Sequence, residues 1–175
     1  MIVAGLDIAT STGVCIGTPG QTPEFWTKNL GKRLPHEQRF SNALRLAHCL
    51  VRQHEVTFIG IEAPIIVPRR DNKAMNELLM GLVACVRGWA HMKGIGCATF
   101  EVACIDKHFV GHRIKGRAAR KAANLARCRQ LGWAPHNEDE ADAGAVFDLA
   151  CALQSRSHAV QTTPLMAAGL LRGAA

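Results

Sequence analysis

Four acidic residues stand where a metal-binding role is easier to explain than a solvated one: Asp7, Glu62, Asp139 and Asp142. Asp7 and Glu62 each end a short apolar run that indicates a buried strand. In α/β sheets, ligands bind beyond the carboxyl ends of the strands. Asp139 and Asp142 are three residues apart at the start of a helical segment, so they share a face. The pattern predicts that the four carboxylates meet at one site.

Asp142 is the most informative of the four because its helical face is otherwise apolar. The apolar members of that face are Ala145, Val146, Leu149 and Leu153. A carboxylate on a stripe that packs against a sheet is costly unless it is paired or bound to a metal. Glu140 and Asp148 lie off this face, so we expect them to be solvated. Glu138 lies closer to it and is an alternative to Asp139 as the fourth ligand.

Clustered carboxylates suit metal-dependent phosphodiester hydrolysis. That reaction must activate a water and stabilise charge on the leaving oxygen, and two Mg²⁺ ions about 4 Å apart can do both. The cations also relieve the repulsion between the carboxylates. The alternative is structural: Asp139 could cap a helix N-terminus, and Asp7 could bond the turn at 10–12.

A basic segment lies immediately before the acidic helix. The chain has a net charge of +7, and residues 107–129 contain eight Lys or Arg and no acid. Such a block can bind phosphates while the acids bind the cations that act on them. The candidate DNA-binding residues are Lys107, Arg113, Lys115, Arg117, Arg120 and Lys121.

The periodicity predicts one α/β domain with a mixed sheet over residues 1–156, and residues 157–175 form a tail to which we assign no role. The expected strands are 2–8, 14–17, 24–30, 57–62 and 96–102, and the expected helices are 36–54, 72–92, 103–110, 117–131 and 139–155. In helix 117–131, the apolar residues Ala118, Ala122, Leu125 and Ala126 share a face, which favours packing of that face.

Composition excludes several classes of protein. No apolar run is long enough to cross a membrane, and the N-terminus does not resemble a signal peptide, so we expect a cytoplasmic protein. The seven cysteines are scattered and never form a CxxC pair. A disulfide framework and a zinc site are therefore not expected.

Four segments resemble the RuvC-type Holliday junction resolvases, which have the RNase H-like fold, and they occur in the same order. These segments are GLDIATSTGVCI, IGIEAP, DKHFVGHRIKGRAARK and DEADAGAVFDLA, within residues 2–155. The DxxDA pattern in DEADA is the sharpest match, since it opens the last helix of that family. GLDIATSTG is less specific, because sugar kinases and actin-like ATPases begin similarly.

The resemblance implies a five-stranded RNase H-like nuclease that cuts four-way junctions as a homodimer. It implies that Asp7, Glu62, Asp139 and Asp142 hold two Mg²⁺ ions, for which Mn²⁺ can substitute. It places Lys107 and Arg120 near two basic residues that serve the active site and the phosphate. The family also has an aromatic residue shortly after the catalytic glutamate, whereas residues 63–70 contain none, so broader cleavage of branched DNA is expected as well.

Three other functions compete with this one. An actin-like or sugar-kinase ATPase needs two such domains, and 175 residues allow one. An RNA-processing nuclease of the YqgF type would share the fold, which does not determine the substrate. A non-catalytic junction-binding protein would not need the carboxylates. Helix 72–92 is apolar enough to be either plain core or the dimer interface.

Overall fold

The structure is a computed structural model that describes residues 1–66, 72–155 and 157–158. Its strands are β1 (Ile2–Asp7), β2 (Ser11–Gly17), β3 (Glu24–Asn29), β4 (Val56–Glu62) and β5 (Gly96–Phe100). Its helices are α1 (His36–His54), α2 (Lys73–Met92), α3 (Val102–Phe109), α4 (Arg117–Gln130) and α5 (Glu138–Gln154). Every element expected from the periodicity is present, with ends that differ by a few residues.

The five strands form one mixed sheet in the order β3-β2-β1-β4-β5. β1 pairs antiparallel with β2, which pairs antiparallel with β3, while β4 lies parallel to β1 and β5 parallel to β4. The expected mixed five-stranded sheet is therefore confirmed. The central strand β1 has no polar side chain before Asp7, as a strand covered on both faces requires.

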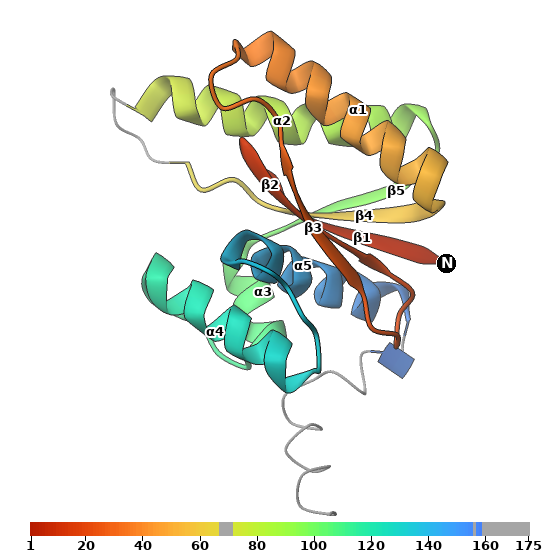
Figure 1. Ribbon diagram of the computed structural model, residues 1–175, viewed down its shortest axis with the longest axis vertical. Helices are drawn as coiled ribbons and strands as arrows, with labels where there is room; N and C mark the ends of the chain where they lie inside the picture. Colours follow the sequence, from red (N-terminus) through yellow and green to blue (C-terminus); the bar gives the residue numbers. More distant parts are fainter. Residues whose placement is uncertain (67–71, 156, 159–175) are drawn as a thin grey trace, which may run out of the picture.

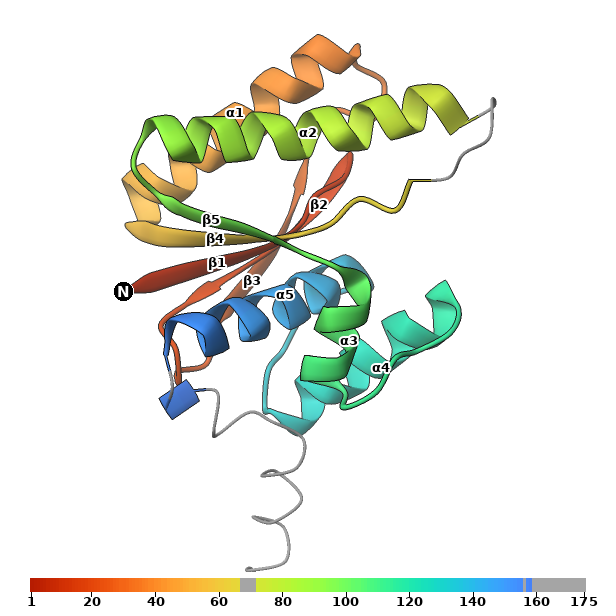
Figure 2. The ribbon, with the colours of Figure 1, turned by 180° about the vertical axis from the view of Figure 1, so that it is seen from behind.

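Helices cover both faces of the sheet (Figures 1 and 2). α1 and α2 pack together on one face, and α3, α4 and α5 lie on the other. Each face has its own apolar core. Leu46, Leu50, Leu78 and Leu82 belong to the core beneath α1 and α2. Phe109, Trp133 and Phe147 lie in the core on the side of α5.

α5 approaches the sheet closely because glycines face it. A Cβ atom at Gly5 of β1 would collide with the backbone of Ala143 and Phe147, and one at Gly13 of β2 with the backbone of Asp139. The small residues bring the helix axis toward the strands, and α3 and α4 pack on its outer side. α5 is consequently buried on nearly all of its faces. The sequence pattern had predicted only one buried face for this helix.

Two expectations about α5 are therefore wrong. Leu153, assigned to the packed stripe, is 61% exposed, whereas Glu140 and Asp148, expected to be solvated, are buried. Glu140 accepts hydrogen bonds from Thr27 on β3 and from the backbone N–H of His136. A helix enclosed by a sheet and two helices has no solvated face along its middle turns.

Asp148, in the C-terminal half of α5, lies between two histidines. Its Oδ2 and Oδ1 atoms are 2.9 and 2.8 Å from Nε2 of His108 and of His158. Nδ1 of His158 accepts a hydrogen bond from the backbone N–H of Gly20, so Nε2 is the nitrogen that carries a proton toward Asp148. Burial alone would raise the pKa of Asp148, but the hydrogen bonds from the histidines bring it below its ordinary value. His158 was assigned to the tail; the rest of the tail lies outside the described residues, apart from Ser157.

The expected apolar face of α4 is packed only at Leu125, which is half-buried against the core on the side of α5. Ala118, Ala122 and Ala126 are exposed, and the buried side chains on this helix are Arg120, Lys121, Asn124, Arg127 and Cys128. The polar face turns inward because it meets acidic groups on the neighbouring elements. Periodicity could not reveal this, since burial of a charged face depends on partners supplied by other segments.

No helix among the described residues has the length and hydropathy of a membrane span. All seven cysteines are free thiols.

Candidate active site

The sheet places Asp7 and Glu62 next to each other. β1 and β4 are parallel neighbours, with Leu6 opposite Ile61, so both strands deliver a carboxylate at the same edge. Glu62 is buried and Asp7 is half-buried. The sequence predicted this pairing from strand ends alone.

α5 brings two further carboxylates to the same edge. Its N-terminal turn crosses β2, where Gly13 leaves room for its backbone and Ser11 Oγ donates a 3.2 Å hydrogen bond to Asp139 Oδ2. Asp142, one turn further along, is 1% exposed. The four predicted carboxylates therefore come from three elements that are distant in sequence and meet at one edge of the sheet.

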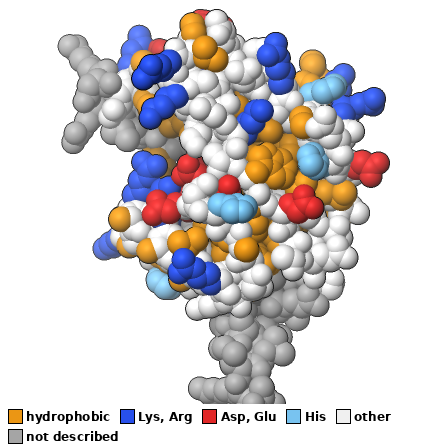
Figure 3. Space-filling model, in the orientation of Figure 1, with side chains coloured by type: hydrophobic (Ala, Val, Ile, Leu, Met, Phe, Trp, Pro, Cys, Tyr) orange, Lys and Arg blue, Asp and Glu red, His pale blue; other side chains and the backbone are white. Residues whose placement is uncertain are grey.

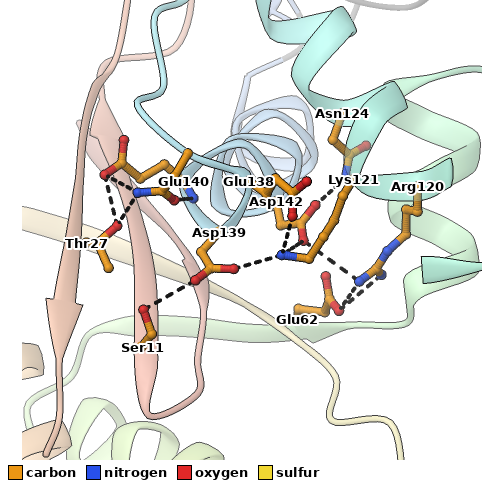
Figure 4. A network of polar contacts seen from close by, with 11 residues as sticks. Ser11, Thr27, Glu62, Arg120, Lys121, Asn124, Glu138, Asp139, Glu140 and Asp142 are labelled. Carbon is orange, nitrogen blue, oxygen red and sulfur yellow. Dashed lines mark hydrogen bonds and ion pairs between the residues drawn. The ribbon is translucent and has the colours of Figure 1, made fainter. Parts of the chain in front are cut away.

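α4 supplies two cations that lie among these carboxylates (Figure 4). Arg120 donates from Nη1 and Nη2 to Glu62 Oε1, each at 3.1 Å. Lys121 Nζ lies 2.8 Å from Asp139 Oδ1 and 3.4 Å from Glu138 Oε2. Arg120 and Lys121, both predicted to bind DNA, are buried and paired within the cluster, and both also line the cleft described below.

Two polar residues of the site were missed in the sequence. Asn124 donates from Nδ2 to Asp142 Oδ1 at 2.7 Å, and Asp106 on α3 accepts from the backbone N–H of Ile114. Asp106 is 1% exposed, and its Oδ1 has no hydrogen-bond partner among the described residues. Asn124 could have been found from its position one turn after Arg120, because the two residues share the polar face of the helix.

Burial and mutual repulsion raise the pKa values of three carboxyls. Asp7 has a pKa of about 8, because it is desolvated and lies near Glu62, Asp142 and Asp139. Burial raises the pKa of Glu62 as well, although Arg120 opposes the rise. Burial also raises the pKa of Asp142, against the hydrogen bond from Asn124. The site therefore holds more negative charge than its environment readily stabilises.

A cleft of about 490 Å³ opens above the carboxylates, and Asp7, Glu62 and Asp142 line it. Its basic lining residues are Arg117, Arg120 and Lys121. The apolar lining residues are Ile8, Ala9, Ala63, Pro64, Ile65, Leu79, Val102 and Ile114. A lining of carboxylates, cations and apolar side chains suits a ligand that carries both phosphate and apolar surface.

The carboxylates are ligands of the type that hard divalent cations prefer, but their positions do not form a coordination site for one ion. Carboxylate oxygens are the ligands that Mg²⁺ and Mn²⁺ prefer, and the pKa of Asp7 is raised first by burial and then by the neighbouring carboxylates. Yet no three His, Cys, Asp or Glu side chains in the described part of the chain are placed to hold one ion together. Arg120 and Lys121 lie among the carboxylates instead.

The remaining predicted site residues lie outside the cluster. Lys107 is exposed on α3 and does not line the cleft, whereas its neighbour Asp106 turns inward. Arg113 and Lys115 are exposed in the segment that joins α3 to α4, and Arg117 lies at the cleft. Figure 3 shows Lys and Arg side chains next to Asp and Glu side chains on the side of the molecule where α4 lies.

Comparison with known proteins finds similarity in structure only. In sequence, the chain matches no protein-family model and no curated protein. In structure it is similar to RuvC of Thermus thermophilus, with a TM-score of 0.66 at 16% identity over 93% of this chain and 98% of that one. The same organism's RuvC in complex with a Holliday junction substrate gives 0.62 at 13% identity, covering 84% of this chain and 90% of that one.

A eukaryotic resolvase has a similar structure. The yeast mitochondrial Holliday junction resolvase gives a TM-score of 0.62 at 9% identity, over 90% of this chain and 79% of that one. Together with the mixed sheet and its flanking helices, these matches confirm the fold expected from the sequence. The chain has the RNase H-like fold of RuvC and other Holliday junction resolvases.

Proposed function

We propose that this protein is a metal-dependent, structure-selective endonuclease that hydrolyses phosphodiester bonds in Holliday junctions or other branched DNA. The observation that carries the proposal is the convergence of Asp7, Glu62 and Asp142 in the lining of one cleft, with Asp139 beside them. Buried carboxylates that repel one another have a structural cost, and a bound cation offsets it.

In the proposed site, metal binding and phosphate binding are functions of different residues. Asp7, Glu62, Asp139 and Asp142 would hold Mg²⁺ or Mn²⁺, which supplies Lewis-acid stabilisation of the charge that develops as the bond breaks. Arg117 at the cleft would bind a phosphate and orient the backbone. The exposed Arg113 and Lys115 would extend that contact along the strand.

The substrate is proposed from the fold and from the charge. RuvC, a structural neighbour, has been seen in complex with a Holliday junction substrate. The basic segment before α5 suits a polyanion. Ile65 and Ile66, which follow Glu62, are exposed and aliphatic, so no stacking aromatic lies there. That composition favours a range of branched substrates over strict selection of four-way junctions.

We also propose that the protein acts as a homodimer. One domain holds one carboxylate cluster, so paired incisions in two strands require two copies. α2 presents exposed apolar side chains, among them Met75 and Met80, and it lies on the opposite face of the sheet from α4 and α5 (Figure 2). Leu79 of the same helix lines the cleft, so such an interface would lie beside the cleft of each copy.

Cleavage of matched substrates tests the proposed function. The wild-type protein is incubated with Mg²⁺ and with four-way, three-way, duplex and single-stranded DNA, and with a structured RNA. We expect cleavage of the branched DNA that stops on addition of EDTA. Asp142→Asn should abolish cleavage but retain binding, because the carboxylate acts on the transition state. The exposed Glu37→Gln on α1 is the control and should cleave normally.

Three outcomes would contradict the proposal. Near-normal turnover by Asp142→Asn would show that the carboxylate cluster is not required for catalysis. Preferred cleavage of the RNA would favour the RNA-processing alternative. Binding of junctions without cleavage at any divalent cation would leave a junction-binding protein.

A further inference from the structure

Lys121 occupies the centre of the acidic cluster. Its Nζ lies 2.8 Å from Asp139 Oδ1, 3.4 Å from Glu138 Oε2 and 3.9 Å from Asp142 Oδ2. The Lys121 side chain is 10% exposed and that of Asp142 is 1% exposed, so attraction between these two charges is screened little by water, whereas Glu138 is 59% exposed. A single ammonium group thus offsets part of the negative charge of carboxylates from two successive turns of α5 (Figure 4).

Arg120 holds the other side of the cluster differently. Both of its terminal nitrogens donate to the same atom, Glu62 Oε1, and Nη2 lies 4.0 Å from Asp142 Oδ2. Glu62 Oε2 takes no part in those two hydrogen bonds. Arg120 can therefore remain bound to Glu62 while Oε2 serves another ligand, whereas Lys121 competes directly for Asp139 and Asp142.

We propose that Lys121 is an internal counterion whose ammonium group occupies the place of a divalent cation. On this view, metal loading requires Lys121 to leave Asp139 and Asp142. The inference rests on the proposed function, because it concerns the metal site of that nuclease. It explains why the site has carboxylate ligands that suit Mg²⁺ although, among the described residues, no three potential ligands are close enough together to hold one ion.

The geometry indicates where the displaced group goes. Lys121 also lines the cleft, and its flexible four-carbon stem can carry Nζ from the carboxylates toward the opening without movement of α4. There it faces the space assigned to the DNA phosphates. Metal binding would thus release a cation onto the substrate side of the site and link metal loading to phosphate binding.

Metal affinity of full-length variants tests the proposal without relying on activity. Binding of Mn²⁺ is measured by calorimetry for the wild type, for Lys121→Met and for the control Arg129→Met. Arg129 lies on the same helix but is exposed, so its removal changes the net charge equally. Removing a competing charge about 4 Å from the site should tighten Mn²⁺ binding at least about tenfold in Lys121→Met. The control should bind as the wild type does.

A second readout addresses geometry and folding. In a crystal of the wild type soaked with Mn²⁺, Nζ of Lys121 should lie away from Asp139. If Lys121→Met does not fold in metal-free buffer, Lys121→Gln keeps a hydrogen-bond donor and should show the same gain in affinity. Unchanged or weaker Mn²⁺ binding in these variants, or a Lys121–Asp139 contact that persists beside bound Mn²⁺, would overturn the proposal.

Those results differ from failure of the nuclease function itself. If wild type binds Mn²⁺ and cleaves junctions but Lys121 variants bind no tighter, only the counterion role is refuted. If no variant binds Mn²⁺ and none cleaves DNA, the proposed function is refuted with it.

Discussion

The side-chain amide of Asn124 donates a 2.7 Å hydrogen bond to Oδ1 of Asp142, and each of the two residues is 1% exposed. Asn124 lies on α4 and Asp142 on α5, so this bond fixes the carboxylate relative to the helix that also carries Arg120 and Lys121. A buried carboxylate that loses such a donor is left with an unsatisfied oxygen.

Asn124→Ala should therefore impair cleavage more than it impairs folding. Loss of one buried hydrogen bond costs about 1–3 kcal/mol of stability. The freed Asp142 carboxylate should raise the Mg²⁺ concentration needed for half-maximal cleavage. Asn124→Asp should be more severe, because it places two carboxylates in contact. Cleavage as a function of Mg²⁺ concentration, together with denaturant unfolding, measures both effects.

Asn137→Ala is the matched control for that prediction. Asn137 caps α5 by accepting a 3.0 Å hydrogen bond from the backbone N–H of Glu140, so its removal should cost about 1 kcal/mol. Its side chain does not line the cleft. Equal effects of Asn124→Ala and Asn137→Ala on the Mg²⁺ requirement would show that Asn124 contributes only to stability.

Asp7→Asn should stabilise the metal-free protein in a pH-dependent way. The pKa of Asp7 is about 8 in the folded protein and 3.8 in a free chain, so the folded state binds this proton more tightly. Its contribution to stability is complete below about pH 4 and is lost as the pH rises through about 8. The neutral Asn is not subject to that loss, and the gain should reach on the order of 2 kcal/mol near pH 8.

Urea unfolding in EDTA at pH 5 and pH 8 measures this gain, which should be larger at pH 8. Glu37→Gln, exposed on α1, should show no such dependence. Addition of Mn²⁺ should reverse the order, since a bound cation stabilises the wild type and Asp7→Asn has lost one ligand. A gain of the same size at both pH values would mean that Asp7 is not desolvated among other carboxylates.

The exposed basic segment should govern DNA affinity through salt-dependent binding of phosphates. Replacing Arg113, Lys115 and Arg117 with Gln should weaken binding to a four-way junction in Ca²⁺. The slope of log K against log salt should fall by about 0.9 for each phosphate that is no longer neutralised, up to about 3 in total. Fluorescence anisotropy across a series of salt concentrations measures it. An unchanged slope would show that this segment faces away from DNA.

His158→Ala should destabilise the fold without changing the chemistry. His158 is 2% exposed and its Nε2 lies 2.8 Å from Oδ1 of the buried Asp148. Removing one partner of a buried carboxylate costs about 3 kcal/mol. Thermal unfolding should show the decrease in stability, while cleavage per folded molecule stays normal. His91→Ala, exposed on α2, should leave stability unchanged. Equal stability of the two variants would contradict the network around Asp148.

Substitution on α2 tests the proposed homodimer. Met80 is 55% exposed and Met75 is 53% exposed. Met80→Lys should shift the protein from dimer to monomer in sedimentation velocity, because an unpaired charge is costly in an apolar interface. Leu153→Lys, at an exposed site on α5, should leave the dimer intact. If the wild type is a monomer at the concentrations used for cleavage, the proposed interface is contradicted.

The sequence by itself determined the order of the elements and the four converging carboxylates. Strands such as β1 carry continuous apolar runs, and α1 carries a clear amphipathic pattern, so local periodicity was sufficient for both. Asp7 and Glu62 could be placed together because both end strands and ligands gather beyond the carboxyl ends of strands. The structure adds that their two strands are parallel neighbours. These inferences needed only properties that are local or fixed by the topology of a sheet.

Only the tertiary structure decided which polar residues face inward. Arg120, Lys121 and Asn124 are buried because α5 and β4 present carboxylates to them, and Asp148 is buried because two histidines reach it. A charged side chain is stable in the interior when partners from elsewhere in the chain neutralise it. Those partners lie up to 58 residues away in sequence for Arg120, so no local pattern encodes the interaction.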